Sequence, residues 1–243
     1  MNSPERKSAW GVPEEPTKEQ LNLAQAIPRL VLASASPARK MELVNAGIEV
    51  IVRPTDADEQ VPQIVPQEKV MAITRRKMDA YLDRQKPLLP VLTCDTMIAF
   101  AGEMIGKPKD RAQAYEQLKA FSGASHEVYT GWALAFPTGS LQLNDRQGKE
   151  DEVRPLYFHE SRSEEGIEVI WYYDHARVEF HPLTETALQA YLDCGEWKGA
   201  AGSYRIQGRG AALIKSIHGD YATVVGLPIS MISGIVSNTV LSQ

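Results

Sequence analysis

Cysteine is scarce in this sequence of 243 residues, and positive charge is not in excess. The two cysteines, Cys94 and Cys194, are too few for a disulfide framework or a cysteine-based zinc site, which favours a reducing compartment, the cytoplasm. The formal net charge of -5 argues against general binding of nucleic acid, while leaving room for a local basic pocket.

Long hydrophobic runs are also missing. The apolar runs fall far short of the roughly 20 residues that a membrane-spanning helix needs, so no membrane contact is expected. Residues 1–28 lack the apolar stretch of a signal peptide and carry four prolines among charged residues. This arm is expected to be partly irregular, with a short helix from Thr17 to Ile27.

Strands and helices alternate in the remainder of the chain, 29–243. Apolar and β-branched runs predict strands at 29–34, 48–53, 90–100, 127–136 and 167–180. Helix patterns and caps predict helices that end at Gly47, that span about 67–84, 110–121 and 184–193, and that begin at Pro228. This order predicts one α/β domain with a mixed sheet and flanking helices.

Two later segments depart from this alternation. Residues 138–170 are rich in glycine, charge and serine, and are expected to form a long exposed excursion. Residues 211–225 are expected to form a hairpin that turns near Gly219 and Asp220.

An apolar strand runs into a possible anion site at Ser34–Glu42. Ser36 is placed to cap a helix that Pro37 opens, and free N–H groups there favour an anion. Arg39 and Lys40 lie in the first turn, where the helix dipole disfavours cations. Either a phosphate binds here, or the two cations are simply exposed; the segment alone leaves both interpretations open.

Asp95 lies inside the apolar strand predicted at 90–100, where a carboxylate is costly unless it is paired, hydrogen-bonded or bound to metal. One interpretation is a ligand for a divalent ion or a base that takes a proton from water. The other is a structural carboxylate bonded to Thr96 and a turn.

Lys107 stands in a Gly–Lys–Pro turn and presents its ammonium either to a phosphate or to solvent. The turn is no P-loop, because only three residues separate Gly102 from Gly106 and proline follows the lysine. His126 either anchors a loop through hydrogen bonds or contacts substrate, and it lacks the second histidine of a zinc-protease motif. Gln207 has two functional interpretations, hydrogen bonding to a nucleobase edge or positioning a water. The structural alternative is an ordinary residue at the edge of a strand.

Six motifs in order carry a family resemblance. They are Ser34-Ala-Ser-Pro-Ala-Arg39, Cys94-Asp-Thr96, Gly106-Lys-Pro108, Ser122-Gly-Ala-Ser-His-Glu-Val-Tyr-Thr130, Ala201-Gly-Ser-Tyr-Arg-Ile-Gln207 and Gly219–Pro228. Read together, they resemble the Maf family of nucleoside triphosphate pyrophosphatases, in the branch that acts on dTTP, UTP and modified pyrimidine nucleotides. The resemblance covers about residues 29–136 and 174–236.

The resemblance implies hydrolysis of a nucleoside triphosphate to a monophosphate and pyrophosphate with a divalent metal, Mg²⁺ or Mn²⁺. It also implies a mixed twisted sheet with a deep cleft, as in inosine-triphosphate pyrophosphatases. It implies Asp95 as base or metal ligand, and Glu42 as support for the metal or for the arginine. It implies substrate binding by Ser34, Arg39, Lys77, Lys107 and Gln207, and supporting roles for Ser36, Thr96, His126 and Thr130.

Three departures from the family pattern leave a second hypothesis open. Ala38 stands where the pattern has its first Arg, Ala200 where Lys is common, and Arg205 where Gly is common. Arg75 or Arg76 is a candidate substitute for the missing cation at position 38. The alternatives to an active enzyme are a nucleotide-sensing or division-regulating protein with weak catalysis, and a structural partner protein. Three roles remain open for the arm at 1–28 and the excursion at 138–170: binding a partner, forming a homodimer, or none.

Overall fold

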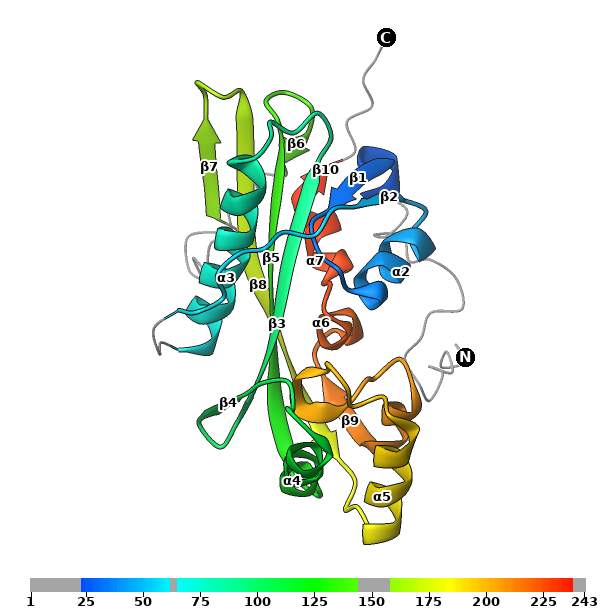
Figure 1. Ribbon diagram of the computed structural model, residues 1–243. Coiled ribbons are helices and arrows are strands. Elements are labelled where there is room, and N and C mark those ends of the chain that lie inside the picture. Colours follow the sequence, from blue (N-terminus) through cyan, green and yellow to red (C-terminus); the bar gives the residue numbers. More distant parts are fainter. Residues whose placement is uncertain (1–22, 62–64, 144–157, 238–243) are drawn as a thin grey trace, which may run out of the picture.

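An eight-stranded mixed sheet forms the frame of the molecule in the computed structural model, which describes residues 23–61, 65–143 and 158–237 (Figure 1). Its strands follow the order β2 (Glu49–Val52), β1 (Arg29–Leu32), β3 (Val91–Phe100), β5 (Ser125–Pro137), β8 (Ile167–Phe180) and β7 (Phe158–Arg162). Strands β2, β1 and β3 pair in parallel, whereas the pairs β3–β5, β5–β8 and β8–β7 are antiparallel. The predicted α/β class with a mixed sheet is confirmed.

Helices cover both faces of this sheet. Helix α3 (Pro66–Leu82) lies on one face, and α2 (Pro37–Asn45), α6 (Tyr221–Val225) and α7 (Ile229–Ile235) lie on the other (Figure 1). Successive side chains of a strand point to opposite faces. In β5, Trp132 and Leu134 therefore join the core beneath α2 and α7, while Ala133 and Ala135 face α3.

Helix α3 comes unusually close to the sheet at Gly131. A Cβ atom at this position would lie 2.7 Å from Thr74 Oγ1 and 2.8 Å from the carbonyl oxygen of Val70. Thr93 reinforces the contact by donating a hydrogen bond to the carbonyl of Thr74 at 3.1 Å. This close approach brings the next turn of α3, which carries Lys77, over strand β3.

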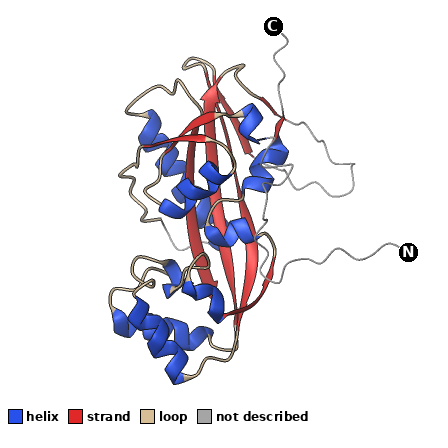
Figure 2. Ribbon diagram, turned by 90° about the vertical axis from the view of Figure 1, so that its right-hand side faces the viewer, coloured by secondary structure: helices blue, strands red, loops and turns tan. Residues whose placement is uncertain are grey.

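A third apolar cluster fills the lower end of the molecule. Helices α4 (Arg111–Phe121) and α5 (Glu185–Cys194) pack there with the short turns η1 (Ala201–Ser203) and η2 (Arg209–Leu213). Figure 2 shows the long strands running from the upper part of the molecule into this lower part. The sheet therefore joins the two upper apolar clusters, one on each of its faces, to a third cluster at the lower end of β3, β5 and β8.

Short strands complete the fold. β4 (Glu103–Ile105) pairs with β3, β9 (Ile214–His218) pairs with β8, and β6 (Gln142–Leu143) pairs with β10 (Val236–Ser237). Residues 23–26 are helical, and Leu23 and Ile27 are buried in the upper core. The helix predicted from Thr17 thus agrees with the structure at its end, while residues 17–22 lie outside the described residues.

The predicted helix boundaries agree with the structure where a cap was identified. Asp110 caps α4 by accepting a hydrogen bond from the backbone of Gln113, and Thr184 caps α5 in the same way from Ala187. Gly195 ends α5 in a left-handed conformation, with φ of 77°.

The hairpin predicted at 211–225 is wrong. Strand β9 pairs with β8 instead, and residues after Asp220 form helix α6. Asp220 caps this helix by accepting a hydrogen bond from Ala222 at 2.9 Å, and Gly226 ends it at φ of 108°. The β-branched residues 223–225 suggested a strand, but the two caps and tertiary packing outweigh that weak preference.

The excursion predicted at 138–170 is only partly exposed loop. Residues 158–162 form β7, a polar edge strand that pairs with β8, and residues 144–157 lie outside the described part of the chain. Glu160 bonds to Arg75 and Arg162 to Asp79, so ion pairs with α3 help to fix the strand. Edge strands are often polar. Because this strand has few apolar residues, the alternation of apolar and polar residues did not predict it.

Candidate active site

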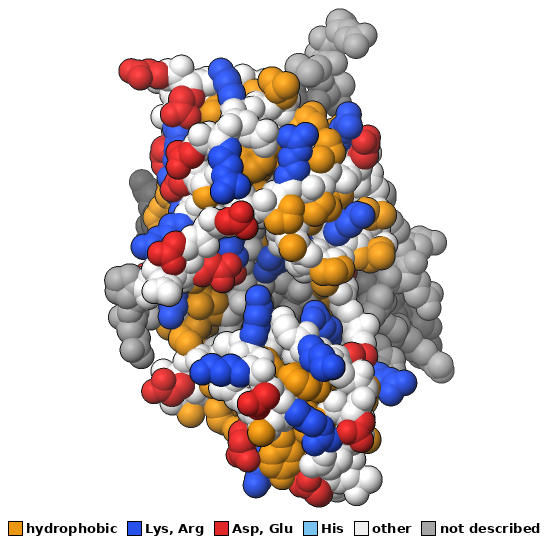
Figure 3. Space-filling model, in the orientation of Figure 1, with side chains coloured by type: hydrophobic (Ala, Val, Ile, Leu, Met, Phe, Trp, Pro, Cys, Tyr) orange, Lys and Arg blue, Asp and Glu red, His pale blue; other side chains and the backbone are white. Residues whose placement is uncertain are grey.

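A cavity of about 610 Å³ opens where strand β3 has no strand beside one edge. On that edge β1 pairs with β3 only at residues 91 and 92, and β4 pairs with it only at 98–100. Between them the described strands leave a gap, which the cavity occupies. Figure 3 shows Lys and Arg side chains gathered around the hollow between the upper and lower parts of the molecule.

The upper wall of the cavity is the loop between β1 and α2. Ser36 caps α2, as predicted, by accepting a hydrogen bond from the backbone N–H of Arg39 at 3.4 Å. Pro37 starts the helix, where its missing N–H leaves no bond unmade. Ser34 Oγ accepts a bond from the backbone N–H of Ser36 and lines the cavity beside it.

Arg39 bonds to three separate segments of the chain rather than pointing freely into the cavity. Its guanidinium donates to Ser34 Oγ at 3.0 Å, to the carbonyl of Cys94 at 2.9 Å, to Thr96 Oγ1 at 3.0 Å and to the carbonyl of Gly226 at 2.8 Å. The residue is buried, with 9% of its surface exposed. Four of its five N–H donors thus serve the protein, and one stays available to a ligand.

A chain of hydroxyl groups extends this network across the sheet. Thr130 donates to the carbonyl of Thr223 at 2.7 Å, and Thr96 Oγ1 lies 2.9 Å from Thr130 Oγ1. Because the Thr130 proton is already committed, Thr96 donates to Thr130 while accepting from Arg39. Gly226 fits here because a Cβ atom would lie 2.8 Å from Thr96 Oγ1.

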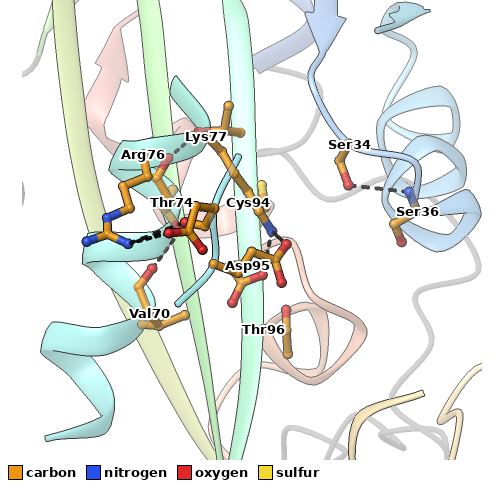
Figure 4. A network of polar contacts seen from close by, with 12 residues as sticks. Ser34, Ser36, Val70, Thr74, Arg76, Lys77, Cys94, Asp95 and Thr96 are labelled. Carbon is orange, nitrogen blue, oxygen red and sulfur yellow. Dashed lines mark hydrogen bonds and ion pairs between the residues drawn. The ribbon is translucent and has the colours of Figure 1, made fainter. Parts of the chain in front are cut away.

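Asp95 and Lys77 form the charged centre of the cavity. Lys77 Nζ lies 2.7 Å from Asp95 Oδ1 and 2.8 Å from Glu59 Oε1. Figure 4 shows Lys77 reaching from α3 to Asp95 on β3, with Ser34 and Ser36 on the other side. The side chains of Lys77 and Asp95 are only 12% and 15% exposed, so their attraction is less screened than that of a surface pair.

Glu59 was not identified from the sequence. It lines the cavity, and burial raises the pKa of its carboxyl group. The hydrogen bond from Lys77 and the charges of Lys77, Lys107 and Arg39 outweigh burial, so the pKa lies below its ordinary value. A signal was present: Asp58 and Glu59 follow β2, whose carboxyl end lies beside that of β1, and ligands gather at that edge of a sheet.

Residues of the lower part of the molecule form the opposite wall. Lys107, Tyr204, Arg205 and Gln207 line the cavity there. Within the described residues the ammonium of Lys107 has no hydrogen bond or ion pair, although it is near enough to Glu59 to lower that carboxyl group's pKa. Ser34, Arg39, Lys77, Asp95 and Lys107, predicted from distant motifs, therefore share one cavity.

Glu42 is not among the residues that line this cavity. Its Oε1 accepts a hydrogen bond from Gln207 Nε2 at 2.7 Å, which links α2 to the lower wall. Burial raises the pKa of Glu42, and the charge of Asp220 raises it further against the bond from Gln207. Glu59, rather than Glu42, is the second carboxylate bonded to Lys77 beside Asp95.

Other predicted cations also lie elsewhere. Arg75 pairs with Glu160 and its guanidinium lies 3.9 Å from the ring centre of Trp171, while Arg76 donates to the carbonyl of Gln60. Neither lines the cavity, so neither replaces the cation missing at Ala38. Cys94 is fully buried, and burial raises its thiol pKa to about 11, which leaves it protonated at neutral pH.

His126 anchors the lower wall from inside the core. Its Nε2 lies 2.8 Å from the hydroxyl of Tyr204, and its ring stacks on Phe121. The residue is 1% exposed and does not line the cavity. Of the two roles left open for it, the anchor fits this position.

The burial of His126 predicts a dependence of stability on pH. Burial lowers the pKa of His126 from 6.5 to about 4. The unfolded chain therefore takes up the proton first as pH falls, so this contribution is complete above about pH 6.5 and is lost toward pH 4. The full contribution of His126 to the free energy of unfolding is roughly 3 kcal/mol.

Urea unfolding between pH 4.5 and 7 measures this slope. His126→Gln removes the titrating ring and is expected to flatten it, whereas Tyr204→Phe keeps the buried imidazole and retains it. Equal slopes for the wild type and His126→Gln would contradict the prediction.

Two features are absent from the described residues. In residues 23–61, 65–143 and 158–237, no helix has the length and apolar character to cross a membrane. Within the same part of the chain, no three His, Cys, Asp or Glu side chains gather as a metal site. Asp95 and Glu59, two of the carboxylates that line the cavity, are both bonded to Lys77.

Comparisons with known proteins agree with the motifs. A family model described as Maf-like protein matches residues 29–239. A dTTP/UTP pyrophosphatase of Symbiobacterium thermophilum is 38% identical over 202 residues, which cover 83% of this chain and 89% of the relative. One of Bacillus cytotoxicus is 36% identical over 205 residues, with 83% and 91% covered. One of Agathobacter rectalis is 33% identical over 214 residues, with 83% and 93% covered. The chain belongs to the Maf family.

Proposed function

We propose that this protein hydrolyses a pyrimidine nucleoside triphosphate, dTTP or UTP, to the monophosphate and pyrophosphate. The observation that carries the proposal is one cavity that holds Asp95 and Lys77 beside Ser34, Arg39 and Lys107. The names of the relatives support the choice of substrate.

Asp95 serves as the base in this reaction. Lys77 holds its Oδ1, and no described group bonds its Oδ2, which is free to accept a proton from water. The water oxygen bonds to the α-phosphorus, the bond from that phosphorus to the bridging oxygen breaks, and pyrophosphate leaves. Positively charged donors stabilise the charge that develops on the leaving group.

The triphosphate is held by donors of both walls. Ser34 accepts from Arg39 and Ser36, so its own proton is available to a phosphate oxygen. Lys107 offers from the opposite wall an ammonium that no described residue bonds, and Arg39 offers the one N–H that no described residue accepts. Gln207 contacts the nucleotide once its bond to Glu42 opens.

The carboxylates present suit Mg²⁺ or Mn²⁺. Mg²⁺ is commonly held by one or two carboxylates together with substrate phosphates, and Asp95 with Glu59 supplies such a pair. A bound ion supplies positive charge that offsets the charge on the phosphates. The scarcity of cysteine supports a cytoplasmic location. Residues 29–243 are proposed as one catalytic domain. The homodimer stays a prediction.

A panel of nucleoside triphosphates tests the proposal. With Mg²⁺ or Mn²⁺, dTTP and UTP are expected to release pyrophosphate with kcat/KM at least about tenfold above ATP and GTP, since a pyrimidine-selective site distinguishes bases through hydrogen bonds. Ion chromatography distinguishes pyrophosphate from phosphate. Release of phosphate alone, or no turnover of any nucleotide, would overturn the proposed reaction.

One observation favours a second candidate. Ala38 lines the cavity without the cation that the family motif places there. A nucleotide-binding protein with weak catalysis would bind dTTP in calorimetry and release almost no pyrophosphate, and rapid turnover in the panel excludes it.

A further inference from the structure

The cations around the cavity differ in how many of their N–H donors are already bonded. Arg39 donates to four protein oxygens, and Lys77 is bonded to Asp95 and Glu59. Lys107 and Arg205 also line the cavity, and neither has an ion pair within the described residues. Most of the unused cationic donors of the site therefore lie on its lower wall.

Arg205 is held in a fixed position on that wall. Its Nε donates to the carbonyl of Glu196 at 3.1 Å and one terminal nitrogen to the carbonyl of Lys198 at 2.9 Å. Its backbone N–H donates to the hydroxyl of Tyr191 at 3.1 Å. Three of the five guanidinium N–H donors have no acceptor among the described residues, so the group is oriented but not satisfied.

The nearby carboxylate does not neutralise this charge. Glu196 also lines the cavity, but its oxygens accept hydrogen bonds from the backbone of Arg209 at 3.0 Å and of Gly210 at 3.3 Å. Arg205 meets only the carbonyl of Glu196. An oriented guanidinium with free donors and no counter-ion suits a phosphate.

The other departures from the family motifs make this position significant. Ala38 and Ala200 line the same cavity and stand where the pattern has an Arg and where Lys is common, while Arg205 stands where Gly is common. Ala200 belongs to the same wall as Arg205, and that guanidinium lies 3.9 Å from where a Cβ of Gly199 would stand. The chain thus loses two cations around the cavity and gains one.

We propose that Arg205 is a substrate-binding residue particular to this chain, which bonds the triphosphate from the lower wall and replaces charge lost at positions 38 and 200. The proposal rests on the proposed function for the identity of the ligand. It assigns phosphate recognition to a position where glycine is common in the family motif.

Arg205→Gln tests the contact, since glutamine keeps a hydrogen-bonding side chain and removes the charge. KM for dTTP or UTP is expected to rise about tenfold with kcat nearly unchanged, the lower end for a charge-assisted bond at an exposed site. Arg209→Gln is the matched control, because Arg209 is exposed, belongs to the same segment and does not line the cavity. An unchanged KM in a folded Arg205→Gln protein would overturn the proposal.

Inorganic tripolyphosphate is the second probe, because its binding in calorimetry needs neither turnover nor a base. Its Kd is expected to rise about tenfold in Arg205→Gln, and Ala38→Arg in that background is expected to restore part of the affinity. An unchanged Kd beside a raised KM would assign Arg205 to the nucleoside and overturn the phosphate contact.

The two probes also distinguish failure of the proposed function. Weaker tripolyphosphate binding in Arg205→Gln without any turnover by the wild type would support the contact and reject the reaction. Turnover by the wild type with no effect of Arg205→Gln would support the reaction and reject the contact.

Discussion

Replacement of Asp95 by asparagine is expected to lower kcat for pyrophosphate release by about 10³-fold, because an amide cannot take the proton of the attacking water. Steady-state kinetics with dTTP or UTP measure the loss. The fold is expected to survive, since Lys77 keeps its bond to Glu59 at 2.8 Å and its ammonium is not left unpaired.

Asp193→Asn is the matched control for this variant. Asp193 pairs with Arg111 at 2.6 Å on the surface of the lower part, with 71% of its side chain exposed. Exposed pairs contribute little to stability, and this one lies outside the cavity, so kcat should not change. Wild-type turnover by Asp95→Asn would remove Asp95 from the mechanism.

Arg39→Lys is expected to cause the largest loss of stability, about 3 kcal/mol, together with a loss of kcat/KM of about 100-fold. A lysine ammonium cannot reach all four oxygens that the guanidinium now bonds, and buried acceptors left without donors are costly. Ser34 and Thr96 would then lose the donor that orients both hydroxyl groups.

Urea unfolding and steady-state kinetics together measure these two effects. Arg29→Lys is the control, because Arg29 forms a surface pair with Glu49 and its side chain is 50% exposed. A stability change below about 1 kcal/mol in Arg39→Lys would show that the bonds of Arg39 do not hold the site together.

The upper wall could be predicted from the sequence because its signals are local. Ser36, Pro37 and Arg39 follow an apolar strand within a few residues, and the cap and helix start depend on that spacing alone. Asp95 was also visible, because a carboxylate in an apolar strand needs a partner. The sequence could not show that this partner is Lys77, which lies on another element.

The parts that sequence reasoning missed depend on tertiary contacts. Glu59 joins the cavity because β2 is parallel to β1, and no local pattern distinguishes it from its acidic neighbours. Strand β7 is polar and is fixed by ion pairs with α3. Arg39 has motif spacing for phosphate binding, yet four protein acceptors take most of its donors, which only the folded arrangement reveals.

The bond between Arg39 and Gly226 spans 187 positions of the chain. During synthesis on a ribosome, residues 29–100 emerge long before the carbonyl groups of Thr223 and Gly226 that complete the network. Contacts of such long range form late, because a large loop must close first. A nascent or truncated chain that ends before residue 220 therefore has the motif residues of the upper wall but lacks two of the acceptors that orient them.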